Sequence, residues 1–343
     1  MARQPTAQSR RVAAALRNLD PQIRRAFTDA VAKAAGGIDQ GELIRLLESG
    51  QIDRAIELLR INRAVLFPLG EAIRAGFVAG GSLVAADIPR GLAGSFGFDG
   101  RHERAEAWVQ RHVGDLIEGI ERETLEMSRD VILDGVQTGR SSAAMARDIT
   151  GRKVGDRRVG GFLGLNSDQT ESVMRARGML SDPDTIRDYF IKDKTTGRMK
   201  PRYKLTDRRF DKMIKKAIAE GRGIAGADLD AIMDAHKSKA MGYRGRVIAK
   251  NESHSALAAG REEGYRQALE NPEVETVTIR WQHNLSQNPR EDHVAMDGTV
   301  IEMGETFNFI DAAMKYPHDP AGGAAHSIGC RCVGIYRVRM RRD

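Results

Sequence analysis

Residues 279–309 read IRWQHNLSQNPREDHVAMDGTVIEMGETFNF, and residues 315–338 read KYPHDPAGGAAHSIGCRCVGIYRV. The stretch 279–336 holds both cysteines, four of the eight histidines and one of the two tryptophans. Before it, apolar residues recur at helical spacing, whereas within it they alternate and turn residues cluster. The sequence therefore predicts a mainly α protein, in which an elongated helical body is followed by a small C-terminal α+β domain built on a short antiparallel sheet or hairpin.

The expected strands follow from local patterns. The β-branched and aromatic residues of VTIRWQH, residues 277–283, favour a strand. The tetrapeptide MDGT at 296–299 carries an Asp-Gly turn signal between two short runs expected to be extended, which predicts a β-hairpin. A last strand is expected over CRCVGIYRV, residues 330–338. Because side chains alternate along a strand, Cys330 and Cys332 should point the same way.

Length and composition narrow the class of protein. A chain of 343 residues is long enough for two folded units plus tails. Lysine and arginine number 54 against 47 acidic residues, a balance that fits a polyanionic partner or an ordinary basic protein. The two cysteines stand one residue apart, which argues against a disulfide-stapled secreted scaffold. We see no secretory leader and no apolar run of ~18 residues, so no membrane crossing is expected.

Four segments are expected along the chain. They are a mobile basic arm over residues 1–19, a helical module over 20–93, a helical body over 94–272, and the α+β domain with a basic tail over 273–343. Asp20-Pro21 is typical of a helix start. Residues 64–88, rich in alanine and glycine but interrupted by Pro68, read as a buried pair of closely packed helices.

The basic segment, defined as residues 192–216, has eleven lysines and arginines against three aspartates, a net charge of +8 that exceeds the +7 of the whole chain. An extended loop or hairpin followed by a helix is expected there. Such a segment can neutralise phosphates whatever the base sequence, although it also fits a solvated face or a surface for an acidic protein. The residues predicted to contact DNA, including a second patch at the C-terminus, are Lys192, Lys194, Arg198, Lys200, Arg202, Lys204, Arg208, Arg209, Lys212, Lys215, Lys216, Arg337, Arg339, Arg341 and Arg342.

An ordered set of residues in the C-terminal stretch resembles one known family. The set comprises Trp281, Arg290, His293, Asp297, Gly298, Phe307, Tyr316, Pro317, Cys330, Arg331 and Cys332. In this order they resemble the C-terminal domain of the phage Mu F-type minor head proteins, the phage head morphogenesis family. The resemblance extends over roughly residues 94–340.

The resemblance implies a function. A relative of these proteins is expected to be a minor head protein of a tailed phage or phage-like particle, lying inside the capsid near the portal vertex, and in the host cytoplasm during assembly. Its partners would be the portal oligomer, double-stranded DNA held without sequence preference, and major capsid or scaffold proteins. It would assist head assembly and DNA packaging or ejection by binding, and would not be an enzyme or contact a membrane.

A structural zinc ion is one interpretation of the cysteine pair, because thiolate and imidazole are the usual ligands of zinc. The best quartet by sequence is His293, His326, Cys330 and Cys332. The two alternatives are that the cysteines are small buried apolar groups that lock the last strand to the sheet, or that they form a strained disulfide. No other cofactor is expected.

Catalytic signatures are missing from the sequence: it has no phosphate-binding Gly-Lys-Ser/Thr loop, no Gly-x-Ser-x-Gly and no His-Glu-x-x-His. The strongest enzyme hypothesis is a metal-dependent nuclease around His283, His293 and Asp297. A stand-alone basic DNA-binding protein is the other alternative. Arg290 and Asp297 are more simply interpreted as partners that satisfy turn backbone and brace the hairpin.

Overall fold

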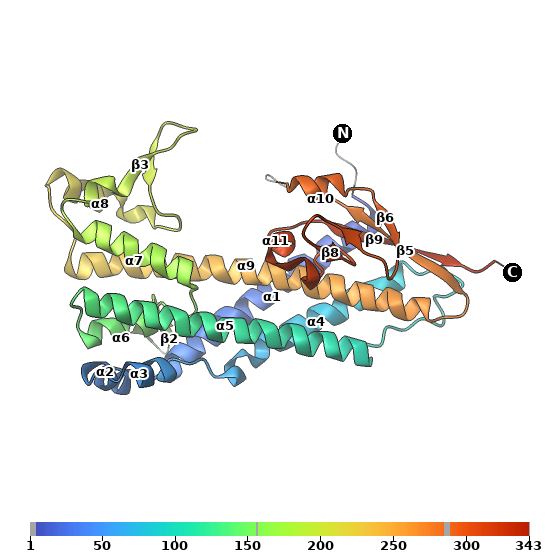
Figure 1. Cartoon of the computed structure of the whole chain (residues 1–343), viewed down its shortest axis with the longest axis horizontal. Helices are drawn as coiled ribbons and strands as arrows, with labels where there is room; N and C mark the ends of the chain where they lie inside the picture. The colour runs from blue at the N-terminus through green and yellow to red at the C-terminus, as the bar shows by residue number, and fades with distance from the viewer. Residues whose placement is uncertain (1–4, 156, 285–288, 343) are drawn as a thin grey trace. The chain divides into compact units, whose positions relative to one another are not determined.

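The computed structural model describes residues 5–155, 157–284 and 289–342, and these form a mainly α fold with a small C-terminal α+β part, as expected (Figure 1). The longer helices are α1 (Ala7–Gly37), α4 (Phe67–Leu83), α5 (Glu103–Gln137), α7 (Ser167–Ser181) and α9 (Gly226–Leu269). The shorter helices are α2 (Gln40–Glu48), α3 (Ile52–Leu58), α6 (Ser142–Thr150), α8 (Asp211–Ala219), α10 (Glu291–Ala295) and α11 (Gly323–Ser327). Single 3-10 turns are η1 (Arg63–Leu66), η2 (Val84–Ala86), η3 (Ile186–Tyr189), η4 (Arg208–Phe210) and η5 (Pro320–Gly322).

The strands are short and all pair antiparallel. They are β1 (Arg152–Val154), β2 (Arg157–Val159), β3 (Phe190–Lys192), β4 (Met199–Pro201), β5 (Val274–Gln282), β6 (Val300–Glu302), β7 (Phe307–Asn308), β8 (Ala313–Met314) and β9 (Val333–Met340). The three-stranded sheet has the order β6-β5-β9, and β1-β2, β3-β4 and β7-β8 are separate two-stranded pairs. The strand predicted over residues 277–283 is therefore the centre of the C-terminal sheet.

The chain divides into two compact units, each made of separate segments. Unit 1 comprises residues 1–27, 67–115 and 246–343, and unit 2 comprises residues 28–66 and 116–245. The contiguous segments expected from the sequence do not coincide with these units, because the continuous helices α1, α5 and α9 each contribute residues to both.

Each unit has an apolar core of its own. In unit 2, Leu43, Ile149 and Tyr189 are among the residues buried between helices and the β3-β4 hairpin. In unit 1, Trp281 of β5, the central strand of the C-terminal sheet, is fully buried, and Tyr336 of β9 stacks on Tyr265 of α9 with ring centroids 4.2 Å apart. Aromatic burial of this kind is the main driving force available to so small a sheet.

The N-terminal arm predicted over residues 1–19 is not an arm in the described residues, which begin at residue 5. Helix α1 starts at Ala7 and runs through Pro21, so the predicted helix start at Asp20-Pro21 is also wrong. The reason is burial: Val12 and Leu19 pack in one apolar cluster with Leu257 and Val333. This gain outweighs the loss of one helical hydrogen bond at the proline.

The predicted close approach of small residues is found between α4 and α9, within unit 1. A Cβ added at Gly80 would collide with the backbone of Leu257, and one added at Gly260 would collide with the carbonyl of Phe77. However, residues 64–88 form one helix flanked by 3-10 turns, and not the predicted helix pair. By length and composition the stretch Ile52–Ala86 is apolar enough to cross a membrane, a property that core helices share.

Candidate metal centre and basic surface

The predicted hairpin forms with one change. Strand β6 pairs with β5 so that Arg280 lies opposite Val300, and the Trp281 N–H donates to the carbonyl of Thr299. The run before the Asp-Gly turn is not extended, since it forms the short helix α10 that carries His293. The last strand also starts later than predicted, at Val333, so both cysteines precede it.

The two cysteines nevertheless face the same group. Cys330 Sγ lies 3.5 Å and Cys332 Sγ lies 3.6 Å from one atom, Nδ1 of His293. All three side chains are buried, with exposed fractions of 4%, 2% and 2%, and both cysteines are free thiols. The disulfide alternative is therefore not adopted, and three of the four residues in the predicted zinc quartet come together.

His326 occupies a different position from the one predicted. Its Nδ1 lies 3.0 Å from Nε2 of His293, on the side of the imidazole that faces away from the cysteines. Its Nε2 lies 3.0 Å from Oδ1 of Asp311, and this hydrogen bond lowers the pKa of the Asp311 carboxyl. His326 thus holds the ring nitrogen of His293 that faces away from the cysteines. Neither the alternation of side chains nor the spacing of residues in the sequence predicts this arrangement.

His318 lies beside the cysteine pair and was not part of the predicted quartet. It is 2% exposed, and its backbone has φ 72°, a left-handed conformation that is uncommon for a residue other than glycine. Neither of its ring nitrogens has a hydrogen-bond partner of normal geometry among the described residues. Its ring packs against His254, with centroids 4.5 Å apart.

The electrostatics of the cysteine pair are asymmetric. A hydrogen bond from Cys332 lowers the pKa of the Cys330 thiol, and interactions with His293 and His318 lower it further against the opposing effect of burial. The same hydrogen bond, together with burial, raises the pKa of Cys332. The Cys332 N–H also donates to Cys330 Sγ over 3.3 Å, so Cys330 is the sulfur that the protein prepares to carry negative charge.

The remaining motif residues have structural positions. Trp281 packs edge-on against Phe307, with centroids 5.1 Å apart, and Tyr316 is buried, which raises the pKa of its hydroxyl. Arg290 donates to the carbonyl of Ile328 over 2.7 Å. Pro317 is buried beside His318, Arg331 is exposed, and Gly298 donates its N–H to the carbonyl of Trp281.

The nuclease hypothesis requires His283, His293 and Asp297 to face one pocket. Asp297 Oδ1 instead accepts the backbone N–H of His283 over 2.9 Å, which is the turn-bracing role expected for it. Both nitrogens of His293 are directed at Cys330, Cys332 and His326. The arrangement in the described residues therefore does not bring these three side chains together as a catalytic group.

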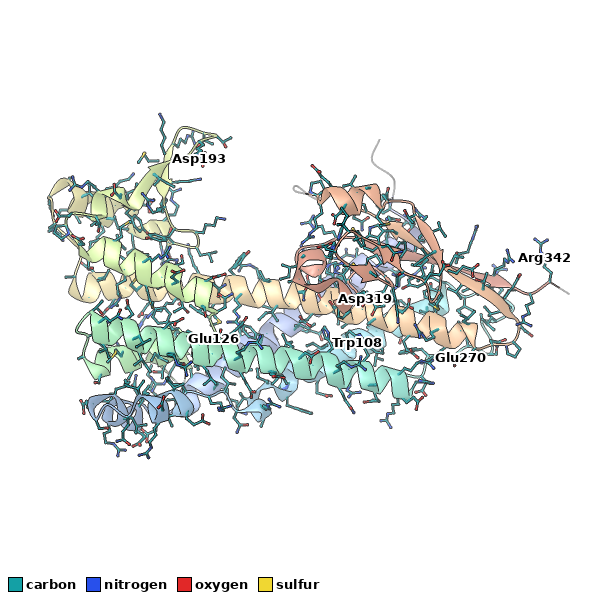
Figure 2. The ribbon with its side chains drawn as sticks, in the orientation of Figure 1. Trp108, Glu126, Asp193, Glu270, Asp319 and Arg342 are labelled. Atoms are coloured by element: carbon teal, nitrogen blue, oxygen red, sulfur yellow. The ribbon has the colours of Figure 1, made fainter. Side chains whose placement is uncertain are left out.

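The basic segment forms the predicted hairpin, β3-β4, followed by η4 and α8. All eleven of its basic side chains are exposed. Asp193, labelled in Figure 2, closes the hairpin loop by accepting the backbone N–H groups of Thr195 and Thr196, and it also pairs with Lys200. That pairing and these hydrogen bonds lower the pKa of Asp193. Four of the eleven, Lys200, Arg208, Arg209 and Lys216, lie within ion-pair distance of acidic neighbours.

The aromatic residues around the basic segment face inward. Tyr189 is 1% exposed and packs against Phe190 and Tyr203, with centroids 5.3 and 6.2 Å apart. Burial raises the pKa of Tyr189 to about 12. These rings stabilise the hairpin and are not free platforms for stacking bases.

The C-terminal arginines are also exposed. Arg337 and Arg339 project from β9, and Arg341 and Arg342 follow it (Figure 2 labels Arg342). Arg339 pairs with Glu275 of the neighbouring strand. This patch belongs to unit 1, whereas the basic segment belongs to unit 2.

One charged cluster had no signal in the sequence. Lys237, 1% exposed on α9, lies 2.9 Å from Asp148 and 3.2 Å from Asp234. Arg140 and Arg177 also pair with Asp148, which lowers its pKa although burial alone would raise it. Lys237 and Asp148 are 89 positions apart in the sequence, which explains why no local pattern reveals the pair.

Comparison with known proteins gives partial matches. Residues 208–335 match the family described as Phage Mu protein F like protein. The chain is 33% identical over 92 residues to an uncharacterized protein, YqbB, of Bacillus subtilis (strain 168), covering 26% of this chain and 29% of that protein. It is 26% identical over 126 residues to the minor head protein GP7 of Bacillus phage SPP1, covering 36% of this chain and 40% of that protein. The chain thus spans less than half the length of either relative, and no solved structure matches it.

Proposed function

We propose, from the match of residues 208–335 to the phage Mu protein F-like family, that the chain is a minor head protein of a tailed phage or phage-like particle. It acts inside the capsid near the portal, where it assists head assembly and the packaging or ejection of DNA. Its partners are the portal oligomer and duplex DNA, with major capsid or scaffold proteins as further candidates. The relative named as a minor head protein supports this proposal.

The exposure of all eleven basic side chains of the basic segment is the observation that supports contact with DNA. Lysines and arginines that neutralise phosphates bind without sequence preference, because all duplexes present the same backbone. The inward-facing Tyr189 and Tyr203 leave no stacking platform on this segment, which favours duplex over single-stranded DNA.

Some of the basic residues are better placed for this role than others. The acidic partners of the four ion-paired residues would have to be displaced, Arg202 donates to the carbonyl of Asp188, and Lys215 lies over the ring of Phe190. The other five have no ion-pair partner among the residues that the structure describes, so their charges are open to an incoming phosphate: Lys192, Lys194, Arg198, Lys204 and Lys212. The first three of these belong to the hairpin end, which we propose meets the DNA first.

The test is co-expression of the chain with the portal and major capsid proteins of its own particle. We expect the chain to sediment with assembled heads, and we expect heads assembled without it to form or fill poorly. A variant in which Lys192, Lys194 and Arg198 become glutamine should still sediment with heads but should hold less DNA. If the chain stays in the soluble fraction and heads made without it fill normally, the proposal fails.

The same preparation separates the two alternatives. A stand-alone DNA-binding protein would bind duplex DNA but would not sediment with a portal ring. A metal-dependent nuclease would cleave duplex DNA when magnesium or zinc is added, and His293→Ala would lose that cleavage. We expect intact DNA under both conditions.

A further inference from the structure

The distances from His293 Nδ1 to the two cysteine sulfurs are those expected between ligands of one metal ion, and hydrogen bonds alone do not account for both. Zinc binds cysteine sulfur at about 2.3 Å and imidazole nitrogen at about 2.0–2.1 Å, so neighbouring sulfur and nitrogen ligands of a tetrahedral ion lie about 3.6 Å apart. The observed separations from His293 Nδ1 are 3.5 Å to Cys330 Sγ and 3.6 Å to Cys332 Sγ. One nitrogen lone pair accepts a single proton, whereas two sulfurs and one nitrogen can all bind the same ion.

The hydrogen bonds behind His293 set which of its nitrogens is free. The Asp311 carboxylate can only accept, so Nε2 of His326 is the donor in this contact. In the tautomer that carries its proton on Nε2, Nδ1 of His326 can accept from Nε2 of His293, 3.0 Å away, and Asp292 Oδ2 lies 3.6 Å from the same Nδ1. A His293 that donates from Nε2 in this way has the lone pair of Nδ1 facing the two sulfurs. Metal-binding histidines are usually held in this way, by a partner on the opposite nitrogen.

The candidate for the fourth position is His318 and not His326. The ligand atoms of His293, Cys330 and Cys332 all lie within 4.8 Å of one another, and the nitrogens of His318 lie outside this group, so its ring would have to close toward the sulfurs to bind the ion. Both nitrogens of His326 are already occupied, by His293 and Asp311. His318 has an exposed fraction of only 2%, and both of its ring nitrogens lack hydrogen-bond partners of normal geometry within the described chain. Burying a polar group without a partner costs free energy, and so does the left-handed backbone of His318. Binding a metal through one ring nitrogen would offset these costs.

We propose that the chain binds one structural zinc ion through Cys330, Cys332, His293 and His318, with His326 and Asp311 as the supporting hydrogen-bond chain. The ligands come from three separate places: helix α10, the loop after β8, and the segment before β9. These parts of the C-terminal region have little regular structure of their own. A zinc ion would join them and stabilise the small sheet, as structural zinc does in other small domains. This inference is independent of the proposed function.

The first experiment measures metal in the wild-type chain. The full chain is purified under reducing conditions without chelator, and its metal content and X-ray absorption spectrum are measured. We expect one zinc per chain, with two sulfur ligands at about 2.3 Å and two nitrogen ligands at about 2.0 Å. If the reduced chain carries no zinc and takes up none when zinc is added, the proposal is overturned.

The second experiment assigns the ligands. In His318→Ala the zinc should show one nitrogen ligand fewer, and the zinc affinity should fall. His326→Ala should keep two sulfurs and two nitrogens while binding zinc ~10–100-fold more weakly, because it removes only a supporting hydrogen bond. His283→Ala is the control, since His283 lies in the same region outside the cluster, and it should bind zinc normally.

The choice of His318 as the fourth ligand can be wrong even if the chain binds zinc. An unchanged spectrum in His318→Ala, or loss of a nitrogen ligand in His326→Ala, would overturn the choice of His318. If a variant does not fold, titration of metal-free wild-type chain with Co²⁺ still tests whether the tetrahedral thiolate site exists. Tetrahedral absorption with sulfur-to-metal charge transfer is expected, and its absence would contradict the site.

Discussion

At the scale of single residues, the buried Lys237–Asp148 pair of unit 2 should contribute strongly to stability. Leaving a buried charge with no partner costs about 3–5 kcal/mol, but Asp148 keeps Arg140 and Arg177 when Lys237 is removed, so the loss is a charged hydrogen bond and not the whole compensation. We therefore expect Lys237→Ala to lower the free energy of unfolding by about 1–3 kcal/mol, measured by urea denaturation with circular dichroism. Lys239→Ala is the matched control, because Lys239 lies on the same helix but is 45% exposed. Its effect should stay within about 0.5 kcal/mol, and equal effects of the two variants would contradict the prediction.

The same cluster predicts a pH dependence. The pKa of Asp148 is lower in the folded chain than its ordinary value, because Lys237, Arg177 and Arg140 outweigh the effect of burial. A lowered pKa stabilises the fold above the ordinary value of about 3.9, and this contribution is lost as the pH falls from there through the folded pKa. The stability gap between wild type and Asp148→Asn should therefore be constant near pH 7 and shrink below about pH 4. If the difference in unfolding free energy between wild type and Asp148→Asn does not narrow in acid, the negative charge of Asp148 is not the source of the stabilisation.

Residues close in sequence were predicted better than residues brought together by the fold. The cysteine pair and His293 could be proposed from residue type and spacing, and the structure brings them together. The position of His326 behind His293 and the unpartnered ring of His318 could not be predicted, because they depend on the contact between His326 and Asp311 and on the left-handed backbone at His318. Neither feature has a local sequence pattern.

At the scale of elements, the α4-α9 contact in unit 1 should be intolerant of a methyl group. A Cβ at Gly260 would meet the carbonyl of Phe77, and backbone cannot move aside as a side chain can. We expect Gly260→Ala to destabilise the protein by about 1–3 kcal/mol in thermal or urea unfolding. The control is Gly114→Ala on α5, where a Cβ meets nothing within 4 Å. That change should be neutral or stabilising by up to about 1 kcal/mol, because alanine favours helix.

Helices and strands were predicted well where a local sequence pattern determines them. They were predicted poorly where contacts with distant residues determine them. Strand β5 and the β3-β4 hairpin follow from propensity and turn residues, and both are present. The N-terminal residues were predicted to be a mobile basic arm because of their polar residues and of Arg3, Arg10 and Arg11. In the structure Gln8 of this segment bonds both the N–H and the carbonyl of Tyr336, so distant partners order it.

At the scale of the whole molecule, the charge is unevenly distributed. The basic segment carries +8 and the whole chain +7, so the rest of the chain is close to neutral at −1. This imbalance was visible in the sequence, whereas the exposure of every basic side chain in the segment and the burial of Tyr189 required the structure. Attraction to a polyanion should therefore be local to the segment and not a property of net charge.

This difference is measurable through the salt dependence of DNA binding. Replacing Lys192, Lys194 and Arg198 by glutamine should weaken binding to a fluorescent duplex, and the slope of log affinity against log salt should flatten by about 0.9 for each phosphate that is no longer neutralised. The control removes the same number of charges elsewhere in unit 2, by replacing the exposed Arg45, Arg54 and Arg60 with glutamine. If net charge governed binding, both triple variants would bind equally weakly, which would contradict a localised DNA site. If the segment governs it, only the first variant should change the slope, and the change should be the same for duplexes of different base sequence, because binding through phosphates does not read the bases.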